Sequence, residues 1–119
     1  MTARIEGTTI YLTRGDTFAA TVEIKNADGS AYEIQNGDVV RFALKSARMK
    51  AGNTDFTDAR PLILKTIPNA TLRLELEPDD TKGQPFGVYK YDIELTKASG
   101  VVDTFINNAD FHILPEVLV

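Results

Sequence analysis

The feature that most constrains the fold is a strictly alternating stretch from Gly87 to Thr96. Aromatic and aliphatic residues occupy every second position and charged residues lie between them: Tyr89, Tyr91, Ile93 and Leu95 against Lys90, Asp92 and Glu94. A strand with one face in a core and the other in water requires this pattern, because successive side chains point to opposite faces. The stretch therefore predicts a long, half-buried strand.

Shorter segments with the same alternation recur along the chain and are separated by turns rich in Gly, Asn, Asp and Pro. The expected strands are Thr8–Thr13, Thr17–Lys25, Ala31–Glu33, Val39–Lys45, Leu62–Ile67, Thr71–Glu77, Val101–Ile106 and Ala109–Leu114. The segments 62–67 and 71–77 are expected to form a hairpin, and Asn107-Asn108 is expected to be a turn. No window of a dozen residues has helical periodicity. The pattern predicts an all-β domain of about 7–9 short strands, a sandwich or a barrel.

A length of 119 residues favours a single domain with its own core. Within it we expect an N-terminal extension at 1–7, a mobile loop at 46–60 and a C-terminal tail at 115–119. Residues 46–60 are polar and irregular, and loops of that length have a function or are mobile. The chain contains no cysteine, which excludes disulfides and thiolate metal sites.

The charge pattern excludes some classes of partner. The net charge is −4, and residues of both signs are interspersed, whereas sequence-independent nucleic-acid binding needs a concentrated basic face. No apolar run approaches the roughly 18 residues of a membrane-spanning helix. The N-terminal residues are too polar for a secretory signal. We therefore expect no nucleic-acid and no membrane partner, and synthesis in a cytosol.

Two tyrosines bear on the choice between a sandwich and a barrel, beside the spacing of strands and turns. In immunoglobulin-type sandwiches, a tyrosine near the start of a strand bonds back to the preceding turn and forms a tyrosine corner. Here Tyr89 is the candidate corner, Tyr91 takes the core position two residues later, and Asp80 and Gly87 belong to the preceding turn. The simpler alternative is two packed core tyrosines. The pattern favours an antiparallel immunoglobulin-like β-sandwich.

The residues that could carry chemistry lack partners in the sequence. His112 lies between Phe111 and Ile113 in an alternating segment, which predicts a solvent-facing imidazole. Asp79 and Asp80 precede no EF-hand spacing, and aspartates near turns generally cap backbone amides. No nucleophile elbow or phosphate loop is present. We therefore predict no catalytic residue, no metal site and no cofactor.

Beyond these patterns, several segments resemble small structural proteins of phages and prophages of Gram-positive bacteria. They are Thr13–Phe18, Asp28-Gly29, Tyr32, Gly37–Lys45, Pro61–Lys65, Pro78–Lys82, Pro85–Ile93 and Val102–Phe105. Together they are similar to the immunoglobulin-like N-terminal domain of baseplate upper proteins, which anchors receptor-binding machinery to the tail tip. The resemblance covers nearly the whole chain. It implies a virion protein of the tail or baseplate, present in the host cytoplasm before assembly.

The leading functional hypothesis is therefore a non-enzymatic phage structural protein that assembles with other tail or baseplate proteins or with copies of itself. Unpaired strand edges and apolar termini provide the means of assembly. The candidate edge is Thr8–Thr13, with Thr9, Tyr11 and Thr13 on one face, and the candidate tail is Val117-Leu118-Val119. The alternative is a carbohydrate or cell-surface binding module that uses Tyr11 or the 46–60 loop.

Overall fold

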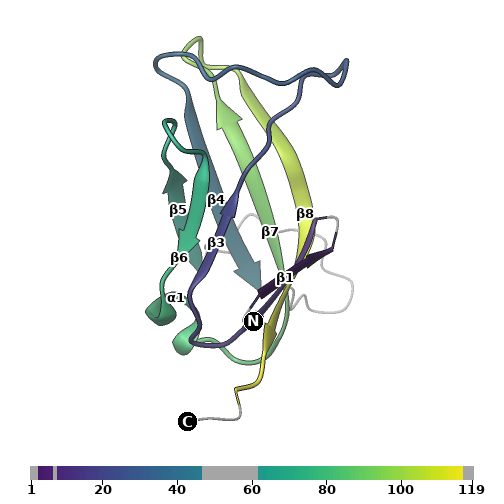
Figure 1. Cartoon of the computed structure of the whole chain (residues 1–119), viewed down its shortest axis with the longest axis vertical. Helices are drawn as coiled ribbons and strands as arrows, with labels where there is room; N and C mark the ends of the chain where they lie inside the picture. The colour runs from purple at the N-terminus through teal and green to yellow at the C-terminus, as the bar shows by residue number, and fades with distance from the viewer. Residues whose placement is uncertain (1–2, 7, 47–61, 117–119) are drawn as a thin grey trace.

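The structure is a computed structural model that describes residues 3–6, 8–46 and 62–116 (Figure 1). Those residues form eight strands and one short helix. The elements are β1 (Ala3–Glu6), β2 (Thr9–Thr13), β3 (Phe18–Thr21), β4 (Val39–Ser46), β5 (Ile63–Ile67), β6 (Arg73–Leu76), α1 (Pro78–Lys82), β7 (Gly87–Thr96) and β8 (Val102–Leu114). The expectation of an all-β chain is confirmed.

The strands form two layers of unequal size. Six strands make one curled sheet in the order β1-β2-β8-β7-β4-β5, and β3 and β6 form a two-stranded sheet in front of it (Figure 1). The pairing of β2 with β8 is parallel, with Ile10 opposite Phe111 and Leu12 opposite Ile113. The expectation of a fully antiparallel sandwich is therefore wrong, because the last strand runs in the same direction as the strand beside which it ends.

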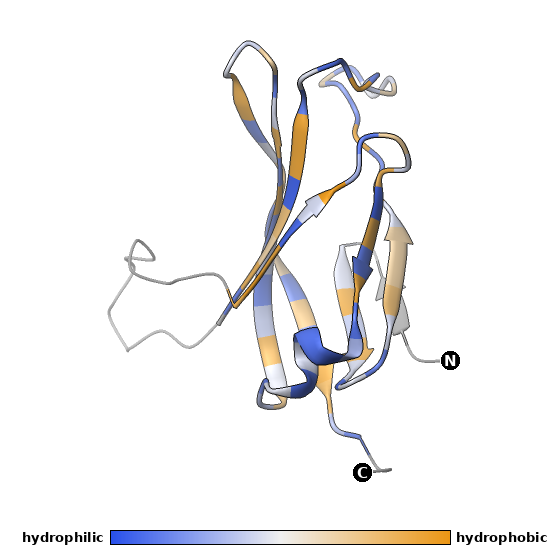
Figure 2. Cartoon of the chain, turned by 90° about the vertical axis from the view of Figure 1, so that its left-hand side faces the viewer, coloured by the Kyte–Doolittle hydropathy of each residue, from blue (hydrophilic) through white to orange (hydrophobic). Residues whose placement is uncertain are grey.

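The core lies between the two layers and draws on both. Hydrophobic and hydrophilic residues alternate along the strands, as the orange and blue segments of Figure 2 show. Three rings at its centre, Phe42, Tyr91 and Phe111, have centroids 5.5 to 6.3 Å apart. The fully buried aliphatic residues around them are Leu12, Val40, Leu44, Ile67, Leu76, Leu95 and Ile113. The alternation of apolar and charged residues in β7 thus corresponds to a strand with one buried face.

The expected turn at Asn107-Asn108 is absent, because β8 continues through it. The register against β7 shifts twice in this region, so that β8 contains extra residues opposite Asp92 and Ile93. Asn108 has a positive φ of 54°, and its N–H donates to Asp92 Oδ1 at 2.5 Å. Asparagine tolerates this backbone conformation, and a bulge uses it to bend a strand without ending it. The two strands expected at 101–106 and 109–114 are one bulged strand.

The expected hairpin between segments 62–67 and 71–77 is also wrong. β5 pairs with β4 in the larger sheet, whereas β6 pairs with β3 in the smaller one. The link between them includes Leu72, whose φ of 50° and hydrogen bond from its N–H to the Pro68 carbonyl at 2.8 Å make a tight reversal. The chain therefore crosses from one layer to the other at this point. The segment expected at Ala31–Glu33 forms a single bridge from Ala31 to Lys25.

The ends of the chain differ from the expectation as well. Residues 3–6, expected to belong to an extension, form β1 and pair with β2. β2 therefore lies between β1 and β8, and the prediction that Thr8–Thr13 is a sheet edge is wrong. The predicted mobile loop lies outside the described residues except for Ser46, which ends β4. The tail residues Val117, Leu118 and Val119 also lie outside them.

Candidate interaction surface

The two tyrosines of β7 both bond to backbone outside their own strand. The hydroxyl of Tyr89 donates to the Pro85 carbonyl at 2.5 Å, four residues upstream, which is the bond that a tyrosine corner requires. The hydroxyl of Tyr91 donates to the Thr8 carbonyl, and burial raises the pKa of Tyr91 to about 12. Tyr89 therefore ties β7 to the preceding turn, and Tyr91 ties it to the entrance of β2.

Asp80 and Gly87 have separate roles, Asp80 at the start of α1 and Gly87 at the start of β7. Asp80 Oδ2 accepts the backbone N–H of Glu77 at 2.7 Å, as in a capping box, and lies 3.0 Å from Lys65 Nζ. This places Asp80 as a cap of α1 that also bonds to β5. Gly87 has a φ of 146°, which side chains rarely adopt, so glycine permits the sharp entry into β7.

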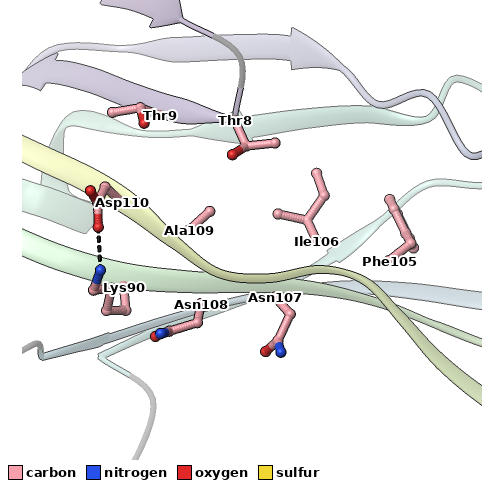
Figure 3. A pocket seen from close by; sticks show the side chains of 9 residues that line it. All are labelled: Thr8, Thr9, Lys90, Phe105, Ile106, Asn107, Asn108, Ala109 and Asp110. Atoms are coloured by element: carbon pink, nitrogen blue, oxygen red, sulfur yellow. Dashed lines mark hydrogen bonds and ion pairs between the residues drawn. The ribbon is translucent and has the colours of Figure 1, made fainter.

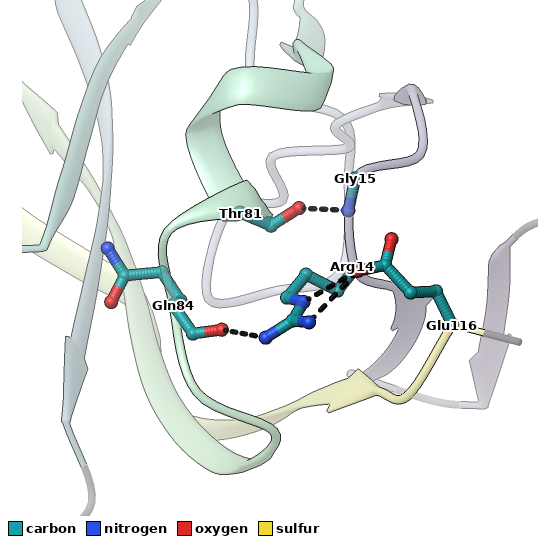
Figure 4. Close-up of polar contacts among 5 residues, drawn as sticks. All are labelled: Arg14, Gly15, Thr81, Gln84 and Glu116. Atoms are coloured by element: carbon teal, nitrogen blue, oxygen red, sulfur yellow. Dashed lines mark hydrogen bonds and ion pairs between the residues drawn. The ribbon is translucent and has the colours of Figure 1, made fainter. Parts of the chain in front are cut away.

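Arg14, which follows β2, bonds to two segments that are distant in sequence (Figure 4). Its Nε and Nη2 donate to Glu116 Oε1 at 3.2 and 2.9 Å, and its Nη1 donates to the Gln84 carbonyl at 3.3 Å. The guanidinium also lies 4.2 Å from the centroid of the Phe86 ring. A fixed, planar guanidinium can satisfy these partners at once. The clamp joins the end of β2, the α1–β7 turn and the end of β8.

At the opposite end, Asp38 joins the β3–β4 connection to the β7–β8 turn. Its carboxylate accepts hydrogen bonds from the Gln35 N–H at 2.8 Å, the Tyr32 hydroxyl at 2.7 Å and the Ala98 N–H at 3.2 Å. These bonds, from Gln35 first and then Tyr32, lower the pKa of the Asp38 carboxyl below its ordinary value. Close packing reinforces the joint, because a Cβ on Gly37 would lie 2.9 Å from that of Ala98. We interpret Asp38 as structural.

The predicted assembly residues of β2 lie on the outer face of the larger sheet. Thr9, Tyr11 and Thr13 alternate there with buried residues. The ring of Tyr11 stacks on His112 of the neighbouring strand, with centroids 4.5 Å apart and an interplanar angle of 18°. Each ring thus covers one face of the other. This differs from a row of aromatic rings that lie flat for sugar stacking, so the arrangement does not support the carbohydrate alternative.

The most distinctive surface feature is a groove along one side of the molecule, which we call the open side. Its volume is about 460 Å³. β3 lies along one side of the groove, and β7 forms its floor. β2 and β8 lie along the other side. The residues that line it are Thr8, Ile10, Phe18, Ala20, Thr21, Val22, Glu23, Leu74, Tyr91, Ile93 and Ile106. The groove exists because a two-stranded layer does not extend across a six-stranded one.

The edge of β3 that faces the groove has no strand partner among residues 3–6, 8–46 and 62–116. On its other edge, the Val22 N–H donates to the Leu72 carbonyl at 2.7 Å, and Ala20 is in register with Leu74. Because backbone groups of successive residues point to opposite edges, those of Ala19 and Thr21 point away from β6. β3 therefore presents a row of unpaired donors and acceptors beside an apolar groove.

The bulged part of β8 forms the far border. β2 pairs only with residues 111–114 of β8, so within the described part of the chain the earlier residues of β8 are paired on the β7 side alone. Figure 3 shows Thr8 and Ile106 on one side of this strand and Asn107 and Asn108 on the other. A second hollow of about 370 Å³ lies here, and the ion pair of Lys90 with Asp110 forms part of its lining. The bulges thus direct Ile106 toward the groove.

Sequence reasoning missed this surface, although a signal was present. Thr17–Val22 is a run of six residues with no charge and no proline. Natural sheet edges generally carry such residues as protection against pairing with other chains. In the described part of the chain, no group of three or more His, Asp or Glu side chains is placed to hold a metal ion. No helix there is long and apolar enough to cross a membrane.

Comparisons with protein-family models, with curated proteins and with solved structures found no match to this chain.

Proposed function

We propose that the chain is a non-enzymatic structural protein of a phage or prophage particle, built into the tail or baseplate through protein–protein contacts. The observation that carries the proposal is the open side, where an uncharged strand edge with no partner among the described residues lies beside an apolar groove of about 460 Å³. Edges and grooves of this kind are used for strand addition between proteins.

Two further features support this assignment. The resemblance to baseplate upper proteins concerns strands and turns, and those segments here contribute to β4, β5, α1, β7 and β8 and to the turns that flank them. The bond from the Tyr89 hydroxyl to the Pro85 carbonyl and the two-layer architecture favour an immunoglobulin-like relationship, with the parallel β2–β8 pair as a departure. In this proposal the chain is found in the virion after assembly in the host cytoplasm.

The test is incorporation into particles. Phage particles are induced from a strain that encodes the chain, purified by density gradient, and quantified for this protein by mass spectrometry against known tail proteins. We expect a fixed stoichiometric ratio to those proteins. A protein that stays in the soluble fraction while complete particles form would contradict the proposal. Binding to defined glycans on an array, with no protein in particles, would favour the carbohydrate alternative instead.

A further inference from the structure

We propose that the open side binds one extended strand of a partner protein, which pairs with the free edge of β3 and places apolar side chains in the groove. This inference rests on the proposed function, since it specifies how the assembly partner is held. It also specifies the partner's chemistry: apolar residues at alternate positions, and a lysine or arginine where the strand passes Glu23.

The groove lies beside the free edge of β3. β3 forms one border and Thr8, Ile10 and Ile106 form the other, with Tyr91 beneath. Its volume of about 460 Å³ falls at the small end of the range of roughly 300–1,000 Å³ for ligand pockets, so it admits side chains but not a folded domain. Neighbouring strands in a sheet lie only about 4.8 Å apart, which lets a single strand reach both β3 and the groove.

The backbone of β3 supplies the pairing groups. Ala19 and Thr21 direct their N–H and C=O groups away from β6, toward the open side, while their side chains point outward and are exposed. The inward side chains of Phe18 and Ala20 line the groove. A partner strand in register with them would bury its own inward residues against the same surface, because pleated neighbours share one face.

The charge of the groove indicates which residue the partner strand carries opposite Glu23. Glu23 is the only charged residue that lines the groove within the described part of the chain, and the whole chain has a net charge of −4. Thr17, Ala19 and Thr21 precede it on the same outward face without charge. A cation opposite Glu23 is therefore favoured, whereas a carboxylate there would be repelled.

A second copy of the chain fits this surface less well. Two β3 edges could pair antiparallel only if the sheets beneath them lay side by side. The larger sheet of each copy, however, extends under its own groove as far as Ile10 and Ile106. That part of the sheet would occupy the space of the second copy. The occupant that we propose is therefore a single strand donated by another protein. A dimer of this chain would be detected in the experiment below by its doubled mass.

The first experiment uses the isolated protein and a synthetic peptide of alternating valine and threonine, with lysine at one threonine position. NMR hydrogen exchange is measured residue by residue. We expect amide exchange at Ala19 and Thr21 to slow by roughly tenfold or more at saturating peptide, which corresponds to about 1.4 kcal/mol. The same peptide N-methylated at alternate residues should give no protection.

Three outcomes would overturn the proposal. Unchanged exchange at Ala19 and Thr21 at millimolar peptide would show that the edge does not accept a strand. Protection already present without peptide, with a doubled mass by light scattering, would assign the edge to a second copy. Protection elsewhere would move the site away from β3.

The second experiment tests the same edge in particles with proline variants. Thr21→Pro removes an N–H that points away from β6, so we expect a folded protein whose incorporation falls at least about tenfold. Ala20→Pro is the matched control, since it removes an N–H directed at β6 and should lower the thermal midpoint. Glu23→Lys should weaken incorporation while Glu33→Lys, outside the groove, should not.

The two proposals fail separately. Wild-type protein in particles together with full incorporation of Thr21→Pro would overturn the strand at β3 and leave the structural function intact. Wild-type protein absent from particles would overturn the structural function, and the peptide result would then decide the strand site alone.

Discussion

The two long sides of the molecule present opposite kinds of surface. On the side formed by β5 and β6, a hollow of about 250 Å³ is lined by the charged residues Lys65, Arg73 and Glu75 together with Thr66, Pro68, Thr71 and Leu74. On the open side, a hollow of about 460 Å³ is lined by aliphatic and aromatic residues with Glu23 as its charge. We call the first the charged side. The comparison shows that the same two layers can protect one pair of edges and leave another available.

The difference has an identifiable physical source. Lys65 on β5 pairs with Asp80 at 3.0 Å, and Arg73 on β6 pairs with Glu75 at 2.7 Å, so charged groups lie along both edges of the charged side. A second chain that approached these edges would have to desolvate those charges. β3 carries no such group. Protection thus depends on a few residues and not on the number of strands.

The largest expected effect on stability comes from shortening a core side chain, and it should differ between the charged side and the open side. Leu76→Ala empties a fully buried position in β6, and we expect a loss of about 3 kcal/mol in the free energy of unfolding. Ile10→Ala removes the same number of carbons beside the groove, where space is already open, and should cost nearer about 2 kcal/mol. Urea denaturation of both variants measures the difference. A larger loss for Ile10→Ala would mean that the groove is as tightly packed as the charged side.

The next prediction concerns the Tyr91 hydroxyl, which bonds to Thr8 at the rim of the groove. Its pKa of about 12 in the folded state exceeds the ordinary value of about 10. The unfolded state therefore loses this proton first, and the contribution to stability is complete below pH 10 and is lost as the pH rises toward 12. We expect Tyr91→Phe to remove this slope from the unfolding free energy between pH 10 and 12. Parallel curves for variant and wild type would contradict it.

The strands could be predicted from sequence wherever one face is buried. In β7, Tyr91, Ile93 and Leu95 are buried and the charged residues between them are not, because the period of two leaves a single solution for such a strand. The predicted bond from the Tyr89 hydroxyl to the preceding turn is also present. The order of residues within one segment was sufficient to predict these two features, because each depends only on residues that are close together in the sequence.

Strand pairing could not be predicted, since it depends on residues far apart in sequence. The reversal at Leu72 resembles a hairpin turn by composition, yet it moves the chain from one layer to the other. Asn107-Asn108 has the composition of a turn, but the hydrogen bond from the Asn108 N–H to Asp92 on β7 stabilises a bulge instead. The open side results from these pairings, so only the uncharged run at Thr17–Val22 pointed to it in advance.

A smaller effect is expected at the turn that leads into β7. Tyr89→Phe removes the hydroxyl that donates to the Pro85 carbonyl, and we expect a loss of about 1 kcal/mol in unfolding free energy. The turn lies between α1 and β7, and its residues are not among those that line the groove. Peptide binding at β3 should therefore be unchanged. A variant that is as stable as the wild type would show that the ring alone, without its hydroxyl, holds the turn.

The smallest expected effect tests whether charge prevents other chains from pairing with the edges of the charged side. Lys65→Ala removes a partly exposed ion pair with Asp80 and should cost at most about 1 kcal/mol, less at high salt. It also leaves the β5 edge without its cation beside Leu64, whose side chain is 56% exposed. We expect the apparent mass by light scattering to rise with concentration more steeply than for the wild type, because the edge becomes available for pairing.

The matched control for that variant is Arg41→Ala, which breaks another exposed ion pair, with Glu94, on a strand that is paired on both sides. This substitution should cost a similar amount of stability and leave the apparent mass unchanged. If both variants associate equally, the net charge of the protein, and not the position of Lys65, prevents its molecules from associating. If neither associates, β6 and α1 protect the β5 edge by covering it, and the contrast with β3 then lies in coverage and not in charge.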